Sequence, residues 1–113
     1  MHTFDKNIKD LDLTIPDIAI PIANYVPYKL FNKNLYISGQ APSKNGNILF
    51  KGKVGVDISE EEGIKAAELC GLNALSVAGA ALDGDLDRIK RVLQLRVFIA
   101  SDRGFTSQSL VAN

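Results

Sequence analysis

The residues best suited to chemistry form the tripeptide Ser38-Gly39-Gln40. It offers a hydroxyl, a residue without a side chain and an amide directly after a hydrophobic run, so its backbone can closely approach a ligand carboxylate or carbonyl. Tyr25, upstream of the same run, could offer its phenol to the same pocket. The alternative is a strand that ends in a turn, with an aromatic residue that only packs. The residues alone leave both interpretations open.

Other familiar catalytic patterns are missing. The sequence has no phosphate-binding loop, zinc-ligand cluster or nucleophile elbow, and its one histidine is His2. Cys70 lies on an apolar helical face and is expected to pack as a small hydrophobic residue rather than react as a thiol. Asp83, Asp85 and Asp87 lack the distal glutamate of a calcium loop and indicate a helix-ending turn. The sequence therefore predicts neither a metal site nor a cofactor.

Short β-prone runs would position the tripeptide. Residues 28–31 and 35–38 flank Asn32, Lys33 and Asn34, and asparagine tolerates the left-handed geometry of a tight hairpin. A loop is expected over 41–47 and a third strand over 48–56, bent at its glycines. Residues 1–24, with two prolines, indicate a loosely attached arm of polyproline or edge-strand character. Residues 25–113 then form the domain.

The clearest local signal is Ser59-Glu60-Glu61-Glu62 ahead of a long apolar segment. Ser59 can cap a helix while Glu62 reaches back to the cap, and acidic side chains suit the helix dipole. Apolar residues at helical spacing continue this helix to the turn at 83–85, and its second apolar face needs a cover, such as a second helix. Residues 92–100 alternate as a central strand does, and residues 105–113 resemble the opening of another helix.

Composition excludes several classes of protein. A chain of 113 residues with 46% hydrophobic content fits one domain. Its 13 basic and 13 acidic residues cancel, which disfavours nucleic acid and anionic membranes as partners. No apolar run approaches the roughly 20 residues of a membrane span, and the start lacks the features of a signal peptide. We therefore expect a cytoplasmic protein without a membrane segment.

Seven motifs follow one another along the chain: Ala23-Asn24-Tyr25-Val26-Pro27, Leu35-Tyr36-Ile37-Ser38-Gly39-Gln40-Ala41-Pro42, Gly52-Lys53-Val54-Gly55, Glu61-Glu62-Gly63 with Ala66-Ala67, Asn73-Ala74-Leu75, Leu86-Asp87-Arg88-Ile89-Lys90-Arg91-Val92, and Val97-Phe98. In this order they resemble the motifs of the Rid/YjgF family, from about residue 16 to residue 113. The resemblance implies an α+β, chorismate-mutase-like fold with a mixed sheet packed on helices. It also implies a homotrimer whose clefts lie between subunits.

The resemblance further implies an activity. The best-defined members hydrolyse reactive enamine and imine intermediates, released by pyridoxal-phosphate enzymes, to 2-oxo acids and ammonia without a metal or cofactor. In this chain Ser38 and Tyr25 match the catalytic positions. Gly39, Gln40 and Asn113 match substrate-binding positions, and the partner would be a 2-imino or enamine acid.

The sequence also departs from the family pattern. Complete members continue into closing strands with an arginine for the substrate carboxylate and, in many, a water-positioning glutamate, so the last helix and the closing strands are expected to be incomplete here. Arg88, Arg91, Arg96 and Arg103 are the available donors, and none matches the family position. The alternatives are a non-catalytic binding or regulatory homologue and an interaction-only domain; the older endoribonuclease or translation-inhibitor label gains little support from the neutral charge. Uncovered strands also predict marginal stability or aggregation.

Overall fold

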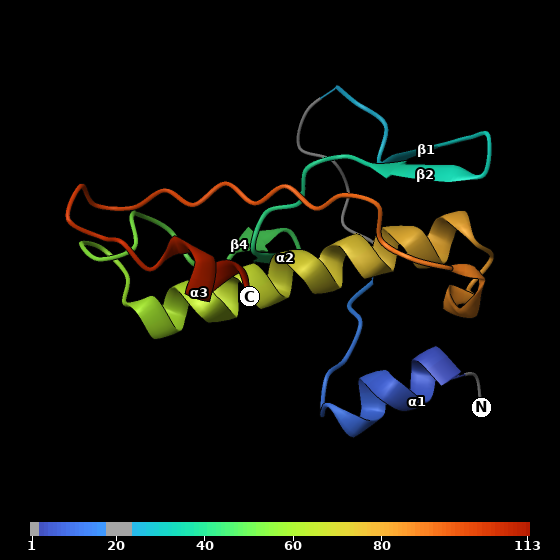
Figure 1. The fold of residues 1–113 in the computed structure, drawn as a ribbon, viewed down its shortest axis with the longest axis horizontal. Helices are drawn as coiled ribbons and strands as arrows, with labels where there is room; N and C mark the ends of the chain where they lie inside the picture. Colours follow the sequence, from blue (N-terminus) through green and yellow to red (C-terminus); the bar gives the residue numbers. More distant parts are fainter. Residues whose placement is uncertain (1–2, 18–23) are drawn as a thin grey trace.

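The computed structural model describes residues 3–17 and 24–113, which form helices and two small antiparallel sheets (Figure 1). The α+β class expected from the sequence is confirmed. In chain order the elements are α1 (Thr3–Asp10), β1 (Tyr28–Phe31), β2 (Asn34–Ile37), β3 (Ser43–Lys44), β4 (Asn47–Ile48), α2 (Glu60–Ala81), the 3-10 turn η1 (Leu86–Arg88) and α3 (Gln108–Ala112).

The first hairpin pairs β1 with β2 in the register Tyr28↔Ile37 to Phe31↔Asn34. Asn32 and Lys33 occupy its two-residue turn at φ 51° and 64°. Positive φ at both central residues defines a type I′ turn, whose twist matches that of the flanking strands. The predicted hairpin is confirmed. Its turn is of this type although Lys33 occupies a position that favours glycine or asparagine.

Residues 41–56 depart from the prediction of a loop followed by one strand. Within the expected loop, β3 and β4 form a second hairpin around Asn45 and Gly46, both at positive φ. The expected strand over 48–56 is wrong beyond Ile48, because left-handed bends at Gly52 and Gly55, φ 113° and 95°, prevent a straight ladder. Only Val54 pairs further, in isolated parallel bridges to residues 58 and 101.

Helix α2 begins as its sequence predicts. The Ser59 hydroxyl accepts from the Glu62 N–H at 3.1 Å, and the Glu62 carboxylate accepts from the Ser59 N–H at 3.1 Å, which completes the capping box. The helix ends at Ala81, where Asp83 and Gly84 take positive φ, as expected for the turn. In the described part of the chain, no helix combines the length and hydropathy that a transmembrane span requires.

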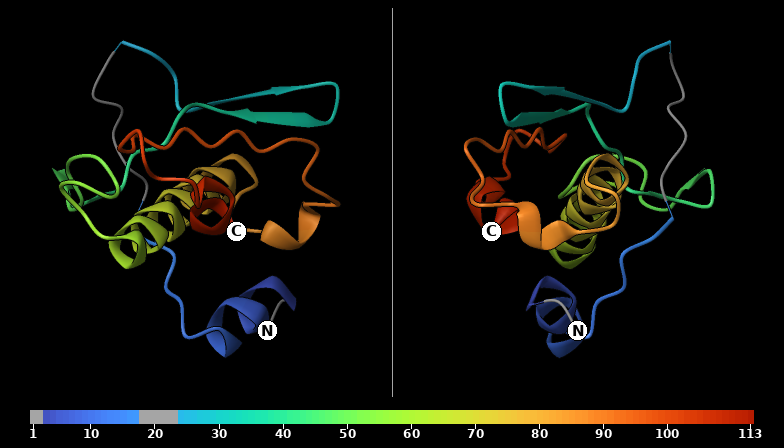
Figure 2. Two further views of the ribbon diagram at one scale, coloured as in Figure 1. Left: turned by 60° about the vertical axis from the view of Figure 1, so that its left-hand side comes forward. Right: turned by 90° about the vertical axis from the view of Figure 1, so that its right-hand side faces the viewer.

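The core lies between α2, α3 and the segments beside them. Among the described residues, its buried apolar members are Val54, Val77, Ala78, Leu82, Leu86 and Val111. At Gly63 a Cβ would come within 3.0 Å of the Val54 side chain and 3.6 Å of that of Val111, so this glycine lets α2 lie close to its neighbours. The expected helix after residue 105 is confirmed as α3, which packs against α2 (Figure 2).

The prediction of polyproline or strand character in the first 24 residues is wrong for residues 3–10, which form α1. Two interactions explain the helix. The Asp87 carboxylate accepts from the N–H groups of Thr3 and Phe4 at 3.1 and 2.7 Å, which caps α1 from far along the chain, and Lys6 pairs with Asp10 at 2.7 Å. His2 and Pro21 lie outside the described residues.

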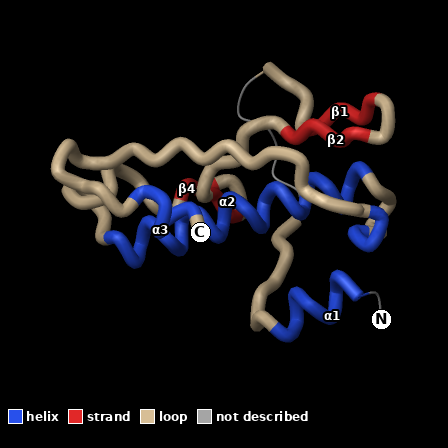
Figure 3. The backbone as a smooth tube through the Cα atoms, viewed as in Figure 1, coloured by secondary structure: helices blue, strands red, loops and turns tan. Residues whose placement is uncertain are grey.

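The expected central strand over 92–100 is also not formed. Among the described residues this segment joins no sheet, and it runs as a long loop beside α2 (Figure 3). The β1–β2 pair forms a sheet of its own, so no described strand lies against this segment along its length. The alternation of apolar residues therefore indicated an extended segment, but it did not indicate which strand, if any, would pair with it.

Candidate functional site

Ser38 lies where the chain leaves β2, opposite the entry to β1. Its N–H donates to the Pro27 carbonyl at 3.0 Å, and its hydroxyl donates to the Val26 carbonyl. Tyr25 directly precedes Val26 and is 43% exposed. The structure thus brings the predicted pair, Ser38 and Tyr25, to the same open end of the hairpin, as the spacing of the two residues suggested.

Gly39 and Gln40 follow Ser38 at this end of the hairpin, and their backbone N–H groups are free donors within the described chain. Among residues 3–17 and 24–113, neither backbone N–H has a hydrogen-bond partner, while the Gln40 side chain donates to the Ser38 carbonyl at 3.1 Å. A Cβ at Gly39 would meet no atom within 4 Å, and φ there is not left-handed. Each of these free N–H groups can donate to a polar group of a ligand.

Asn73 positions the segment that follows Gln40, a role that the motif containing it in the sequence did not indicate. It is 1% exposed, and its side-chain amide donates to the carbonyls of Ala41 and Ser43 at 3.0 and 2.9 Å. These bonds tie the segment that follows Gln40 to the middle of α2. In the sequence, this role could have been inferred from a single amide side chain on a mostly apolar helical face, because a buried amide must find hydrogen-bond partners.

Asn113, the remaining predicted substrate contact, lies at the end of α3. Its backbone N–H donates to the Ser109 carbonyl at 3.0 Å, and its side chain is exposed. No hydrogen bond joins it to the described residues around Ser38. Its role therefore stays a prediction.

Cys70 is half-buried on α2, and burial raises the pKa of its thiol. A thiol in that state is a poor nucleophile near neutral pH, in line with the packing role expected for it. Among the described residues, no group of three or more histidine, cysteine, aspartate or glutamate side chains could hold a metal ion.

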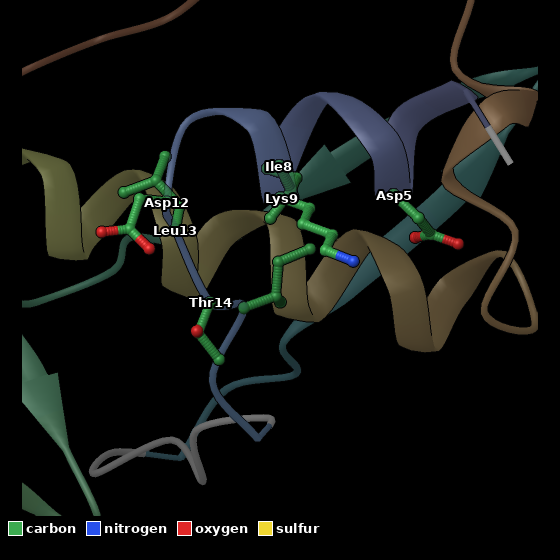
Figure 4. Close-up of a pocket in the computed structure, with 7 residues that line it drawn as sticks. Asp5, Ile8, Lys9, Asp12, Leu13 and Thr14 are labelled. Carbon is green, nitrogen blue, oxygen red and sulfur yellow. The ribbon is translucent and has the colours of Figure 1, made fainter. Parts of the chain in front are cut away.

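Two open cavities lie elsewhere. One, of about 460 Å³, is lined by α1 and the loop after it; its residues are Asp5, Ile8, Lys9, Asp12, Leu13, Thr14 and Ile15 (Figure 4). The second, of about 270 Å³, is lined partly by the same loop after α1 and partly by Glu68, Leu69 and Leu72 of α2. Neither contains Tyr25 or Ser38. Tyr25 and Gly39 are exposed, so the predicted site lies at the open surface of the single chain.

Known proteins place this geometry in context. Residues 6–107 match the family model described as "YjgF/chorismate_mutase-like, putative endoribonuclease". Protein TCP17 of Trypanosoma cruzi is 42% identical over 107 residues, which cover 95% of this chain and 66% of that protein. The chain thus spans slightly less than two thirds of this relative.

Two solved structures share the fold. The protein Atu1372 of Agrobacterium tumefaciens, of unknown function, is 42% identical with a TM-score of 0.84, over 96% of this chain and 66% of that one. A structure from Shewanella oneidensis MR-1, described as a putative endoribonuclease, is 34% identical with a TM-score of 0.74, over 80% of this chain and 60% of that one. The resemblance seen in the ordered motifs is confirmed: this chain belongs to the YjgF/chorismate-mutase-like family.

Proposed function

We propose that this protein hydrolyses 2-imino or enamine acids to 2-oxo acids and ammonia at the end of the hairpin that holds Ser38. The observation that carries the proposal is the pair of free N–H groups at Gly39 and Gln40, directly after Ser38, whose hydroxyl reaches the Val26 carbonyl next to Tyr25. These donors suit an anionic substrate that has a polar reacting centre. The chain spans 66% of its curated relative, so further parts of the site are expected outside the residues that match.

The chemistry requires orientation and charge stabilisation. Water adds to the carbon of the C=N bond, and the nitrogen takes up a proton. The resulting carbinolamine then expels ammonia as its hydroxyl proton is lost, which leaves a 2-oxo acid. The free amides would hold the substrate carboxylate, and the hydroxyls of Ser38 and Tyr25 would orient the attacking water.

The proposed function includes an oligomeric state of the protein. The site is open in the single chain and neither cavity contains it, so enclosure by a neighbouring subunit would exclude bulk water. We therefore propose a homotrimer with the reaction in the intersubunit cleft. The cytoplasm, where pyridoxal-phosphate enzymes release such imines, is the compartment that the proposal implies.

The endoribonuclease description of the family model and of the Shewanella protein supplies a competing activity. RNA cleavage draws on a general acid and base together with positive charge for phosphates. The chain has balanced charge and a single histidine near its start, and the Ser38 segment itself carries no ionisable group. These features favour the small carboxylate as substrate.

The test is imine hydrolysis in vitro. An amino-acid oxidase generates the 2-imino acid in the presence of semicarbazide, and the protein competes with the trapping reaction. We expect Ser38→Ala and Tyr25→Phe to slow hydrolysis, whereas Tyr36→Phe, an exposed tyrosine on β2, should leave the rate unchanged.

The outcomes separate the alternatives. Hydrolysis that depends on Ser38 and Tyr25 supports the proposal. Absence of hydrolysis with saturable binding of a 2-oxo acid would instead assign a non-catalytic binding role. Cleavage of an RNA oligonucleotide that the Ser38 variant abolishes would favour the competing activity.

A further inference from the structure

Gly39 and Gln40, the centre of the proposed site, lie between two anchored ends. On one side, the Ser38 N–H donates to a carbonyl at the entry to β1 at 3.0 Å. On the other side, the Ala41 carbonyl accepts from the Asn73 side chain at 3.0 Å. A Cβ at Gly39 would meet no atom within 4 Å, so nothing packs against this residue on that side. The positions of the two backbone N–H groups therefore depend on the two anchors.

The anchor on the Ala41 side is a compact turn that also contains Pro42 and Ser43. The Ser43 N–H donates to the Ala41 carbonyl at 2.8 Å, and the Leu49 N–H donates to the Pro42 carbonyl at 2.9 Å. The Asn73 amide donates to the carbonyls of Ala41 and Ser43 at 3.0 and 2.9 Å. A single NH₂ group with two donors thus holds both ends of the turn.

Asn73 is suited to hold this turn in one place. It lies within α2 and is 1% exposed. A side chain on a helix is placed more precisely than one on a loop, and burial restricts its rotamers. The strands that follow the turn, β3 and β4, are two residues long each and form a weak frame. Asn73 therefore ties the turn to the long helix.

We propose that Asn73 is a positioning residue for the imino acid site. Through the turn, it fixes where Gly39 and Gln40 present their N–H groups to the substrate carboxylate. This inference rests on the proposed function. A displacement of about 1 Å in a site can reduce the rate by about 100-fold. Removal of the amide should therefore impair substrate binding as well as the stability of the fold.

Steady-state kinetics of imine hydrolysis separates positioning from stability. Partial unfolding lowers the concentration of active protein, so the apparent kcat falls while KM stays the same. Displaced donors instead weaken the contact with the substrate carboxylate, so KM rises. We expect Asn73→Ala to raise KM about fivefold or more, part of the effect of one hydrogen bond to a charged group.

Two further variants make the comparison decisive. Gly63→Ala is the matched control: it lies about 15 Å from Asn73 along α2, and the atoms nearest to its new methyl group belong to Val54 and Val111. It should destabilise the fold and leave KM within about twofold of the parent value. Pro42→Gly loosens the turn without changing α2, because proline fixes φ. It should also raise KM, and it tests the inference even if Asn73→Ala does not fold.

Hydrogen exchange reports on the turn directly. The Leu49 amide, which donates to the Pro42 carbonyl, should exchange faster in Asn73→Ala than in Gly63→Ala. Equal exchange in these two variants would show that Asn73 does not hold the turn and would overturn the inference.

The kinetic outcomes separate this inference from the proposed function. If the parent hydrolyses imines and both Asn73→Ala and Pro42→Gly keep its KM, only the inference is wrong. If the parent binds a 2-oxo acid without hydrolysing imines, only the proposed function is wrong, and the dissociation constant of that acid replaces KM in the same comparison. Weaker binding by both variants would then support the inference, and unchanged binding would overturn it. A parent that neither hydrolyses imines nor binds a 2-oxo acid would overturn both.

Discussion

Replacement of Asn73 by alanine should destabilise the fold more than its size suggests. The side chain is 1% exposed, and it donates to the Ala41 and Ser43 carbonyls at 3.0 and 2.9 Å. A typical intramolecular hydrogen bond contributes about 0.5–1.5 kcal/mol, so the two together contribute about 1–3 kcal/mol. Alanine recovers roughly 0.5 kcal/mol through its higher helix propensity, while the space left by the amide adds a cost. The expected net loss is about 2 kcal/mol.

Urea unfolding followed by circular dichroism measures this change. With a slope of about 1–3 kcal/mol per molar urea, the midpoint should fall by roughly 1 M. Asn47→Ala is the matched control, because the Asn47 amide makes one exposed contact, to the Asn45 carbonyl at 3.3 Å. That variant should stay within about 0.5 kcal/mol of the parent protein.

A second substitution checks the direction of the hydrogen bonds. Asn73→Asp keeps the shape of the side chain but replaces its donors with an acceptor that faces two carbonyls, so it should be at least as harmful as alanine. Equal midpoints for Asn73→Ala and Asn47→Ala would refute the claim that Asn73 anchors the segment after Gln40 to α2.

Other substitutions test the elements around the site. Ser59→Ala removes one half of the capping box and should cost about 1 kcal/mol in thermal unfolding, whereas Ser107→Ala, at an N-cap without a side-chain hydrogen bond, should cost little. Gly63→Ala should destabilise by about 1–3 kcal/mol, because the new methyl group meets the Val54 side chain at 3.0 Å. Gly71→Ala, with no atom within 4 Å of the new methyl group, should instead stabilise by about 0.5–1 kcal/mol. Asp87→Ala removes the cap of α1, so trypsin should cleave faster at the lysines of that helix; unchanged cleavage would contradict the capping role.

Local signals predicted the elements whose stability is local. The capping box at Ser59 defined the start of α2, and Asn32 with Lys33 defined the first hairpin, because in both cases the interacting residues are close in sequence. The place of Ser38 at the end of β2 followed from that hairpin. Its backbone hydrogen bond to the Pro27 carbonyl continues the pairing of β1 and β2, whereas the bond from its hydroxyl to the Val26 carbonyl does not follow from that pairing.

Elements that depend on distant partners were predicted poorly. Helix α1 is capped by Asp87, which lies 84 residues after Thr3 in the sequence, and no pattern near Thr3 indicates that interaction. The burial of Asn73 likewise depends on carbonyls of the β3 segment. The segment over 92–100 has the alternation of a strand, but alternation does not reveal whether a partner lies beside it.

A substitution at Gly39 can show whether the end of the first hairpin binds and hydrolyses an imino acid. A methyl group there meets no atom of the described protein within 4 Å, so Gly39→Ala should fold as the parent does. The new methyl group should nevertheless occupy the space of the substrate. The measurement is the rate of 2-imino acid hydrolysis for the parent, Gly39→Ala and the control Gly71→Ala. We expect a loss of about tenfold or more for Gly39→Ala alone; equal rates for all three proteins, or no hydrolysis by the parent, would rule out imine hydrolysis at this end of the hairpin.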